Sequence, residues 1–345
     1  MNVAAARWAA RAGYSLLLRI AVPLVALRVL WRGRREPLYA VDIGGRYGFY
    51  RRSAPTGGAL WLHAVSLGET RAAAPLIEAL RGQRPGLRLL LTHGTATGRA
   101  AGASLLRDGD LQAWLPFDTP GAVERFLGHF QPIAGVLMET EIWPNLLAIA
   151  SRRGLPMLLA NARLSPRSRG RGERVDALLR PAFESLIAVL AQSEADAARL
   201  RAAGAGEVTV VGNLKYDIDP DPLLLARGRA WRAGLGRGVV LAASTREGEE
   251  AMLLAAWRAL AGPRPLLVVV PRHPQRFEAV AESIAAAGFS MSRRSAWSGD
   301  ERAAAAAADV WLGDSMLEMP AWYALADVAL LGGSFAPLGG QNLIE

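Results

Sequence analysis

The stretch LWLHAVSLGETRAAAPLIEALRGQRPGLRLLLT, residues 60–92, contains the pattern that decides the fold. Two apolar runs of strand length, 60–65 and 87–92, flank an Ala-rich segment with helical periodicity at 71–81. A strand, a helix and a second strand in this order form a βαβ unit, and its two strands lie parallel in one sheet.

The same alternation continues along the chain on both sides of one interruption. Further strands are predicted at 112–115, 133–138, 157–160, 186–191 and 208–211, and then at 239–242, 266–270, 310–312 and 328–331. The segment between the two series, GNLKYDIDPDP at 212–222, collects Gly, Asn, Asp and Pro, as linkers do. We therefore predict an α/β protein with two Rossmann-like, doubly wound parallel-sheet domains, residues 36–211 and 223–345, that face each other across a cleft.

Composition narrows the class of protein. The chain has 345 residues, 51% of them hydrophobic, and no Cys, which excludes disulfides, thiolate metal sites and thiol nucleophiles. Of its 40 basic residues only Lys215 is a lysine. Residues 1–70 carry ten arginines against three acidic residues, while the rest of the chain is nearly balanced. Charge concentrated at one end favours an anionic membrane surface as partner, and we expect no nucleic acid partner.

The N-terminus contains an apolar segment at 14–31, YSLLLRIAVPLVALRVLW, inside a predicted anchor region of residues 1–35. Eighteen residues are near the lower limit for a membrane-spanning helix, and Arg19, Pro23 and Arg28 interrupt the segment. Three interpretations of the segment therefore remain: a short membrane-spanning helix, a helix that lies in the membrane interface, and a helix packed on the protein's own surface. If the segment spans, Arg32, Arg34 and Arg35 directly after it place the body of the protein in the cytoplasm.

Carboxylates follow two of the strands in the first half. Glu69 stands in the first turn of a helix after Ser66, where a carboxylate can cap the helix or, in a cleft, act as general base. Glu139 and Glu141 follow the strand at 133–138, so we expect them outside the core, with one facing the cleft. Helix N-terminal charge is the alternative interpretation for both.

The second half contains residues suited to a phosphate-bearing ligand, although it has neither a Walker sequence nor a GxGxxG motif. They are Ser244, Thr245, Arg272 and His273, together with the small-residue loops 332–334 and 339–340. The four His residues have no metal-ligand spacing, and we expect neither a metal ion nor an organic cofactor.

Ten blocks, taken in order, resemble the Kdo transferases of lipopolysaccharide synthesis. The blocks are RYGFY (46–50), VSLGE (65–69), LPFDTP (115–120), METEIWPN (138–145), NARLS (161–165), GNLKYD (212–217), STREGEE (244–250), PRHPQRF (271–277), GDSMLEM (313–319) and GGQNLIE (339–345). These enzymes are GT-B glycosyltransferases that move 3-deoxy-D-manno-octulosonic acid (Kdo) from CMP-Kdo to lipid A precursors at the cytoplasmic face of the inner membrane.

The resemblance implies specific roles for residues of this chain. Glu69 would be the general base, and Glu139 and Lys215 would stabilise the transition state. CMP would be held by Pro271, Arg272, Met316, Leu317, Glu318, Asn342, Leu343, Ile344 and Glu345. The family's N-terminal membrane anchor corresponds to residues 14–31.

The chain also departs from the family pattern. Arg246 stands where His is common, Leu317 where Gly is common, and the last block reads GGQNLIE where GGHNPLE is usual. Since the chain ends at Glu345 inside that block, we expect an incomplete second domain. Two alternatives stay open: a GT-B transferase that uses a UDP- or ADP-sugar, and an inactive membrane-peripheral binding protein with this fold.

Overall fold

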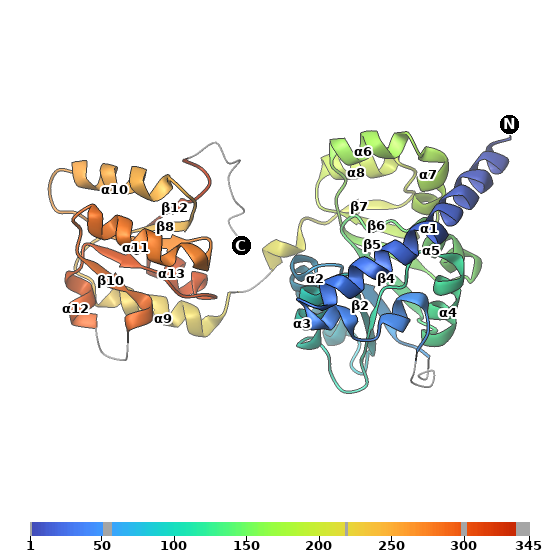
Figure 1. Ribbon diagram of the computed structural model, residues 1–345, viewed down its shortest axis with the longest axis horizontal. Coiled ribbons are helices and arrows are strands. Elements are labelled where there is room, and N and C mark those ends of the chain that lie inside the picture. Colours follow the sequence, from blue (N-terminus) through green and yellow to red (C-terminus); the bar gives the residue numbers. More distant parts are fainter. Residues whose placement is uncertain (1, 51–56, 218–219, 298–301, 336–345) are drawn as a thin grey trace. The chain divides into compact units, whose positions relative to one another are not determined.

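The computed structural model describes residues 2–50, 57–217, 220–297 and 302–335. Its internal contacts divide the chain into two compact units, Met1–Ile218 and Asp219–Glu345, which are drawn in blue to yellow and yellow to red in Figure 1. Each unit is built around its own parallel sheet.

The sheet of the first unit has seven parallel strands in the order β3-β2-β1-β4-β5-β6-β7. The strands are β1 (Leu60–His63), β2 (Leu89–His93), β3 (Leu111–Trp114), β4 (Ala134–Met138), β5 (Met157–Ala162), β6 (Ala188–Ala191) and β7 (Val208–Val210). All seven were predicted, and each end of each strand lies within two residues of the predicted one. The chain order reverses between β1 and β4, and the carboxyl ends of strands at such a switch point are where open α/β sheets bind ligands.

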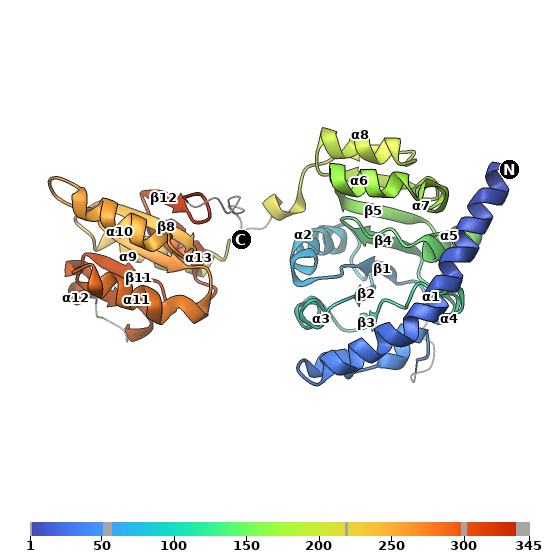
Figure 2. The same ribbon diagram turned by 45° about the horizontal axis from the view of Figure 1, so that its top comes forward.

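Helices cover both faces of this sheet (Figure 2). Trp61 packs into the cluster under α4 and α5, whereas its neighbour Leu62 packs under α2, because successive strand residues point to opposite faces. The helices are α2 (Leu67–Gln83), α3 (Ala96–Ala103), α4 (Pro120–Phe130), α5 (Pro144–Arg152), α6 (Pro166–Glu173), α7 (Asp176–Glu184) and α8 (Glu194–Ala202). Short 3₁₀ turns lie at η1 (Pro37–Ala40), η2 (Ile43–Tyr47) and η3 (Leu214–Asp217).

The second unit has five parallel strands in the order β10-β11-β9-β8-β12. They are β8 (Val239–Thr245), β9 (Leu266–Pro271), β10 (Met291–Arg293), β11 (Val310–Leu312) and β12 (Val328–Leu331). Its helices are α9 (Pro222–Ala233), α10 (Glu249–Ala259), α11 (Phe277–Ala286), α12 (Arg302–Ala307) and α13 (Met319–Leu325), with 3₁₀ turns η4 (Pro274–Arg276) and η5 (Arg294–Ala296). Strand β10 was not predicted, because its three half-buried residues Met-Ser-Arg form no apolar run.

Helix α1 (Val3–Gly33) includes the whole apolar segment and has two different apolar faces. Val22 and Ala26 are buried against the first unit, while a second stripe on the opposite side is exposed. That stripe consists of Leu16, Leu17, Ile20, Leu24, Leu27 and Trp31. By length and composition α1 could cross a membrane, with 22% of its most apolar window buried. The structure thus shows both packing on the protein's own surface and an apolar face left uncovered.

Asp118 of the LPFDTP block ties α1 to α5. Its carboxylate accepts hydrogen bonds from the backbone N–H groups of Asn145 and Leu146, at 3.1 and 2.7 Å, and so caps the start of α5. The Tyr14 hydroxyl of α1 donates to the same carboxylate at 2.9 Å. Burial raises the pKa of Asp118 to about 6, although these three hydrogen bonds oppose the rise. The block therefore has a structural role.

Candidate active site

The first candidate site lies where β1 and β4 end side by side. Ser66 is the N-cap of α2, and its hydroxyl accepts from the backbone N–H of Glu69 at 3.3 Å. In return Glu69 accepts from the Ser66 hydroxyl at 3.1 Å and from the backbone N–H of Val65 at 2.8 Å. Glu69 thus caps α2, as one of the two interpretations predicted.

Capping does not exhaust the capacity of Glu69 to accept protons. Each carboxylate oxygen takes one hydrogen bond in the structure and has a second lone pair. Burial raises the pKa of Glu69, and the charge of Glu139 adds to the rise, while the Val65 and Ser66 hydrogen bonds and Arg163 lower it. A fixed, half-buried carboxylate with a raised pKa has the properties of a general base.

Glu139 follows β4 directly and is more buried than we expected, with its side chain 9% exposed. Its backbone adopts a left-handed conformation, φ 57°, which L-residues visit rarely and which is found often at functional sites. The Nε of Arg163, one residue beyond β5, donates to the Glu139 carboxylate at 2.9 Å. A buried carboxylate is stable here because Arg163 compensates its charge.

Glu141 belongs to the same cluster. The indole N–H of Trp143 donates to its carboxylate at 2.9 Å. Burial raises the pKa of Glu141 to about 7, and the charges of Glu69 and Glu139 contribute to the rise. Three carboxylates therefore meet at the switch point of the first sheet, where the charge of Glu139 raises the pKa of both Glu69 and Glu141.

Lys215 lies in η3, the last described segment of the first unit, which packs against α2. Two side-chain amides hold this turn. Asn161 accepts from the backbone N–H of Leu214 at 3.1 Å, and Asn213 accepts from that of Lys215 at 3.0 Å. Lys215 is half-buried, and its position is set by contacts of the first unit, including the packing of Leu214 beneath α2.

Asn161, in the NARLS block, was not predicted as a site residue. Asn161 is buried at the end of β5 with φ 51°, and its Nδ2 has no hydrogen-bond partner among the described residues. A signal was present in the sequence, since Asn tolerates the left-handed region and is uncommon at the end of an apolar strand.

In the second unit the switch point lies between β8 and β12. Ser244 there has φ 54°, and Gly332 lies so close that a Cβ would be 2.2 Å from the Ser244 carbonyl oxygen. The buried Glu249 accepts from the backbone N–H of Gly333 at 2.7 Å. Thr245 is also fully buried, and its hydroxyl donates to Glu250 at 2.6 Å. Thr245 and Glu249 of the STREGEE block therefore hold loops together.

The predicted CMP-binding residues follow β9 and β11 at the same edge of this sheet. Pro271 ends β9, and the half-buried Arg272 donates its backbone N–H to the carbonyl of Thr245 at 3.0 Å. Met316 and Leu317 are exposed, at 57% and 74%. Leu317 has φ 65°, which explains physically why Gly suits this position.

Glu318 is committed to partners within the unit. Its Oε1 accepts from Arg227 and from Arg294, both at 2.8 Å, and Ser315 donates to its Oε2 at 2.5 Å. Although burial opposes ionisation, these bonds lower the pKa of Glu318 overall. Asn342, Leu343, Ile344 and Glu345 lie outside the described residues.

Comparison with known proteins identifies the family. The family described as "3-Deoxy-D-manno-octulosonic-acid transferase (kdotransferase)" matches residues 42–218. A 3-deoxy-D-manno-octulosonic acid transferase of Bordetella pertussis is 50% identical over 97% of this chain and 80% of its own length. The corresponding protein of Haemophilus influenzae is 34% identical over 96% of this chain and 78% of its own. The chain belongs to the Kdo transferase family.

The solved structures support the fold of this Kdo transferase. A UDP-GlcNAc 2-epimerase from Neisseria meningitidis aligns with 79% of this chain and 76% of its own, with a TM-score of 0.52 at 12% identity. The resemblance in fold is thus much broader than the resemblance in sequence. The family assignment and the two parallel-sheet domains confirm the predicted class of enzyme, a glycosyltransferase that transfers Kdo in lipopolysaccharide synthesis.

Proposed function

We propose that this chain transfers Kdo from CMP-Kdo to a lipid A precursor, lipid IVA, with inversion at the anomeric carbon and with Glu69 as general base. The observation that carries the proposal is that the carboxylates of Glu69, at the start of α2, and Glu139, directly after β4, lie close enough at the β1–β4 switch point to interact electrostatically. There the capping bonds hold Glu69 in place and its pKa is raised.

The proposed reaction balances with the residues of this chain. A hydroxyl of the acceptor sugar attacks the anomeric carbon of Kdo and gives its proton to Glu69. The bond from that carbon to the phosphate oxygen breaks, and CMP leaves with the electron pair. Glu139 offsets the positive charge that develops on the sugar ring, and the ammonium of Lys215 offsets the negative charge on the departing phosphate.

The second unit would supply the donor site. Pro271, Arg272 and the segment Met316–Glu318 lie at the carboxyl edge of its sheet, where doubly wound folds bind nucleotides. Because the Glu318 side chain is held by two arginines, we assign CMP contacts in this segment to backbone groups. Because Met316 and Leu317 are exposed, a nucleotide can reach the backbone of this segment from solvent.

The exposed stripe of α1 supports association with the inner membrane. Six large apolar side chains on one side of a helix, flanked by Arg19 and Arg28, favour a helix lying in the interface of the cytoplasmic leaflet. A lipid acceptor in the same leaflet would reach a protein held there by diffusion within the membrane surface.

Replacement of Glu69 by Gln tests the proposal. The Gln side chain retains a carbonyl oxygen that can accept from Val65, so α2 stays capped while the base is lost. We expect the rate of Kdo transfer to fall about 10²–10⁴-fold. Mass spectrometry of the lipid product measures this rate. CMP-Kdo binding should be nearly unchanged. Glu78→Gln, on the exposed side of the same helix, is the matched control and should retain full activity. A Glu69→Gln enzyme with more than roughly a tenth of the wild-type rate would exclude Glu69 as the base.

A further inference from the structure

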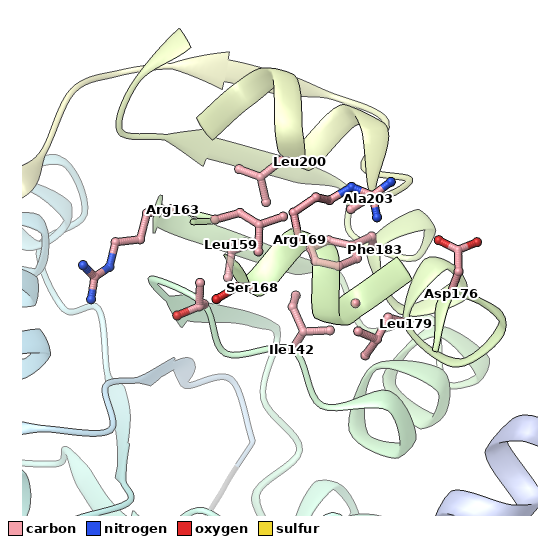
Figure 3. Close-up of a pocket in the computed structure, with 13 residues that line it drawn as sticks. Ile142, Leu159, Arg163, Ser168, Arg169, Asp176, Leu179, Phe183, Leu200 and Ala203 are labelled. Carbon is pink, nitrogen blue, oxygen red and sulfur yellow. The ribbon is translucent and has the colours of Figure 1, made fainter. Parts of the chain in front are cut away.

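A cavity of about 230 Å³ lies in the first unit, and Figure 3 shows the side chains that line it. It is enclosed by the end of β5, the loop after β4, and helices α6, α7 and α8. Its walls are mainly aliphatic and aromatic, from Ile142, Leu159, Leu164, Leu179, Phe183 and Leu200. None of the roles proposed for the catalytic or nucleotide-binding residues uses this cavity.

The loop after β4 serves both the cavity and the cluster. Thr140 and Ile142 line the cavity, whereas Glu139 and Glu141, which alternate with them, interact electrostatically with Glu69. Arg163 also lines the cavity, and it donates to Glu139. A ligand in the cavity therefore contacts residues that are direct sequence neighbours of Glu139 and Glu141.

The chain segment 163–174, which contributes Arg163, Ser168 and Arg169 to the cavity lining, is strongly basic. Five arginines lie between residues 163 and 174, and Arg163, Arg167, Arg171 and Arg174 among them are exposed. Arg169 is less available, since it donates to the carbonyl of Ala202 and pairs with Glu173. An aliphatic cavity lined on one side by an arginine-rich segment is complementary to an amphiphile with an anionic head group.

Helix α6 covers the cavity with few contacts of its own. It has no buried residue, and Gly170 and Gly172 weaken it as a helix. Ser168 of α6 lines the cavity and is exposed, which places this side chain at the mouth. Because α6 buries so little surface, the free energy needed to displace it from the cavity is small.

We propose that this cavity binds a segment of one acyl chain of the lipid acceptor, while the arginines of residues 163–174 contact its anionic head group. The assignment rests on the proposed function, which brings the lipid acceptor to the carboxylate cluster that this loop helps to form. The volume is adequate, since an apolar cavity of about 150 Å³ already admits a benzene ring.

A bulky side chain at the mouth tests the assignment. Ser168→Trp would obstruct the cavity from an exposed position, so the fold should tolerate it. Gly170→Trp adds the same side chain to the same helix outside the lining, where a new Cβ meets nothing within 4 Å, and is the matched control. Thermal unfolding of both variants should match the wild type.

The first readout is independent of catalysis. A dodecyl phosphate that carries a terminal diazirine is photolysed with the full chain, and the labelled peptides are mapped by mass spectrometry. We expect labels on α7 near Leu179 and Phe183 in the wild type and in Gly170→Trp, and none there in Ser168→Trp. Added lipid acceptor should compete with the label, and ordinary phospholipid should not.

The second readout compares two acceptors. If only two methylenes of the acyl chain are excluded from the cavity, the affinity for the acceptor falls about tenfold. Ser168→Trp should therefore raise the KM for the acylated acceptor by at least that factor. The KM for the deacylated, water-soluble head group should stay at the wild-type value. Gly170→Trp should behave as wild type with both acceptors.

Several results would overturn the assignment. They are labels outside the cavity, equal competition by phospholipid, or an unchanged KM for the acylated acceptor in an active Ser168→Trp enzyme. If the wild type itself failed to transfer Kdo, the proposed function would be wrong, and the photolabel would still show whether the cavity takes an acyl chain.

Discussion

The Nε2 atom of His63 lies 3.9 Å from Oε2 of Glu141, and yet the two side chains do not form an ion pair. Nδ1 of His63 lies 3.0 Å from the carbonyl oxygen of Thr92, which can only accept, so Nδ1 carries the proton and Nε2 does not. Complete burial lowers the pKa of His63 to about 3. The imidazole is therefore neutral and supplies no positive charge to balance that of Glu141.

Glu141→Gln should change the pH dependence of activity. In the wild type, burial and the charges of Glu69 and Glu139 raise the pKa of Glu141 to about 7, and the repulsion between the Glu69 and Glu141 carboxylates is mutual. The Gln variant removes that repulsion, so the acidic limb of the kcat/KM profile should move to lower pH. A limb that stays in place or moves to higher pH would contradict this coupling.

The same substitution should change the pH dependence of stability. Because the folded-state pKa of Glu141 is raised, its contribution is fully present below the unfolded value of 4.5 and is lost as the pH rises through about 7. Relative to the wild type, Glu141→Gln should therefore gain unfolding free energy between pH 5 and pH 8, by an amount on the order of 3 kcal/mol at most. Urea unfolding at several pH values measures this difference.

Ser66→Ala should affect both the stability and the chemistry of α2. Loss of the N-cap hydroxyl should reduce the unfolding free energy by about 1 kcal/mol. Since the Ser66 hydrogen bond also lowers the pKa of Glu69, its loss should move the acidic limb of the activity profile to higher pH. Ser66→Thr, which keeps the hydroxyl, should restore both properties. A purely structural role for Ser66 would leave the profile unmoved.

Lys215→Arg should keep the positive charge and lose most of the activity. The position is half-buried in η3, and the planar guanidinium cannot replace a compact ammonium in such a site. We expect kcat to fall at least about tenfold, with thermal unfolding unchanged. Near-normal turnover by the Arg variant would show that Lys215 has no special role.

The two faces of α1 should respond differently to polar substitutions. Replacing Leu17, Leu24 and Leu27 by Ser should move the protein from the membrane pellet to the soluble fraction, because these side chains are 63%, 68% and 63% exposed. Each buried leucine contributes about 1.5–3 kcal/mol to such binding. Val22→Ser, on the buried face, is the contrasting variant. It should lower the melting temperature and leave sedimentation with membranes unchanged, and equal sedimentation of both variants would exclude the exposed stripe as the membrane contact.

Local patterns were sufficient to predict most of the fold and part of the site. The alternation of apolar runs and helical segments predicted eleven of the twelve described strands, and the order of chain elements predicted two parallel sheets. The capping of α2 by Ser66 and Glu69 is also local, since both residues lie within four positions of Val65. Such features depend on backbone geometry that a few neighbouring residues control.

Other features depend on residues far apart in the chain. Asp118 caps α5 from 27 and 28 positions away, and Asn161 holds the turn of Lys215 from 53 positions away. The apolar run in α1 was ambiguous in the sequence because its hydropathy is the sum of two faces, of which only one meets the first unit. Which face is covered is a matter of tertiary packing.

The sequence by itself determined the two-sheet architecture and the family, because strand and helix patterns and ordered motifs are properties of contiguous residues. Only the tertiary structure decided the state of the carboxylates. The pKa values of Glu69 and Glu141 depend on burial and on the charges that β1, β4 and β5 bring together. The neutrality of His63 depends on its complete burial, and the carbonyl of Thr92 on the neighbouring strand decides which ring nitrogen carries the proton. Desolvation and through-space charge act over distances in the folded protein that separation along the chain does not express.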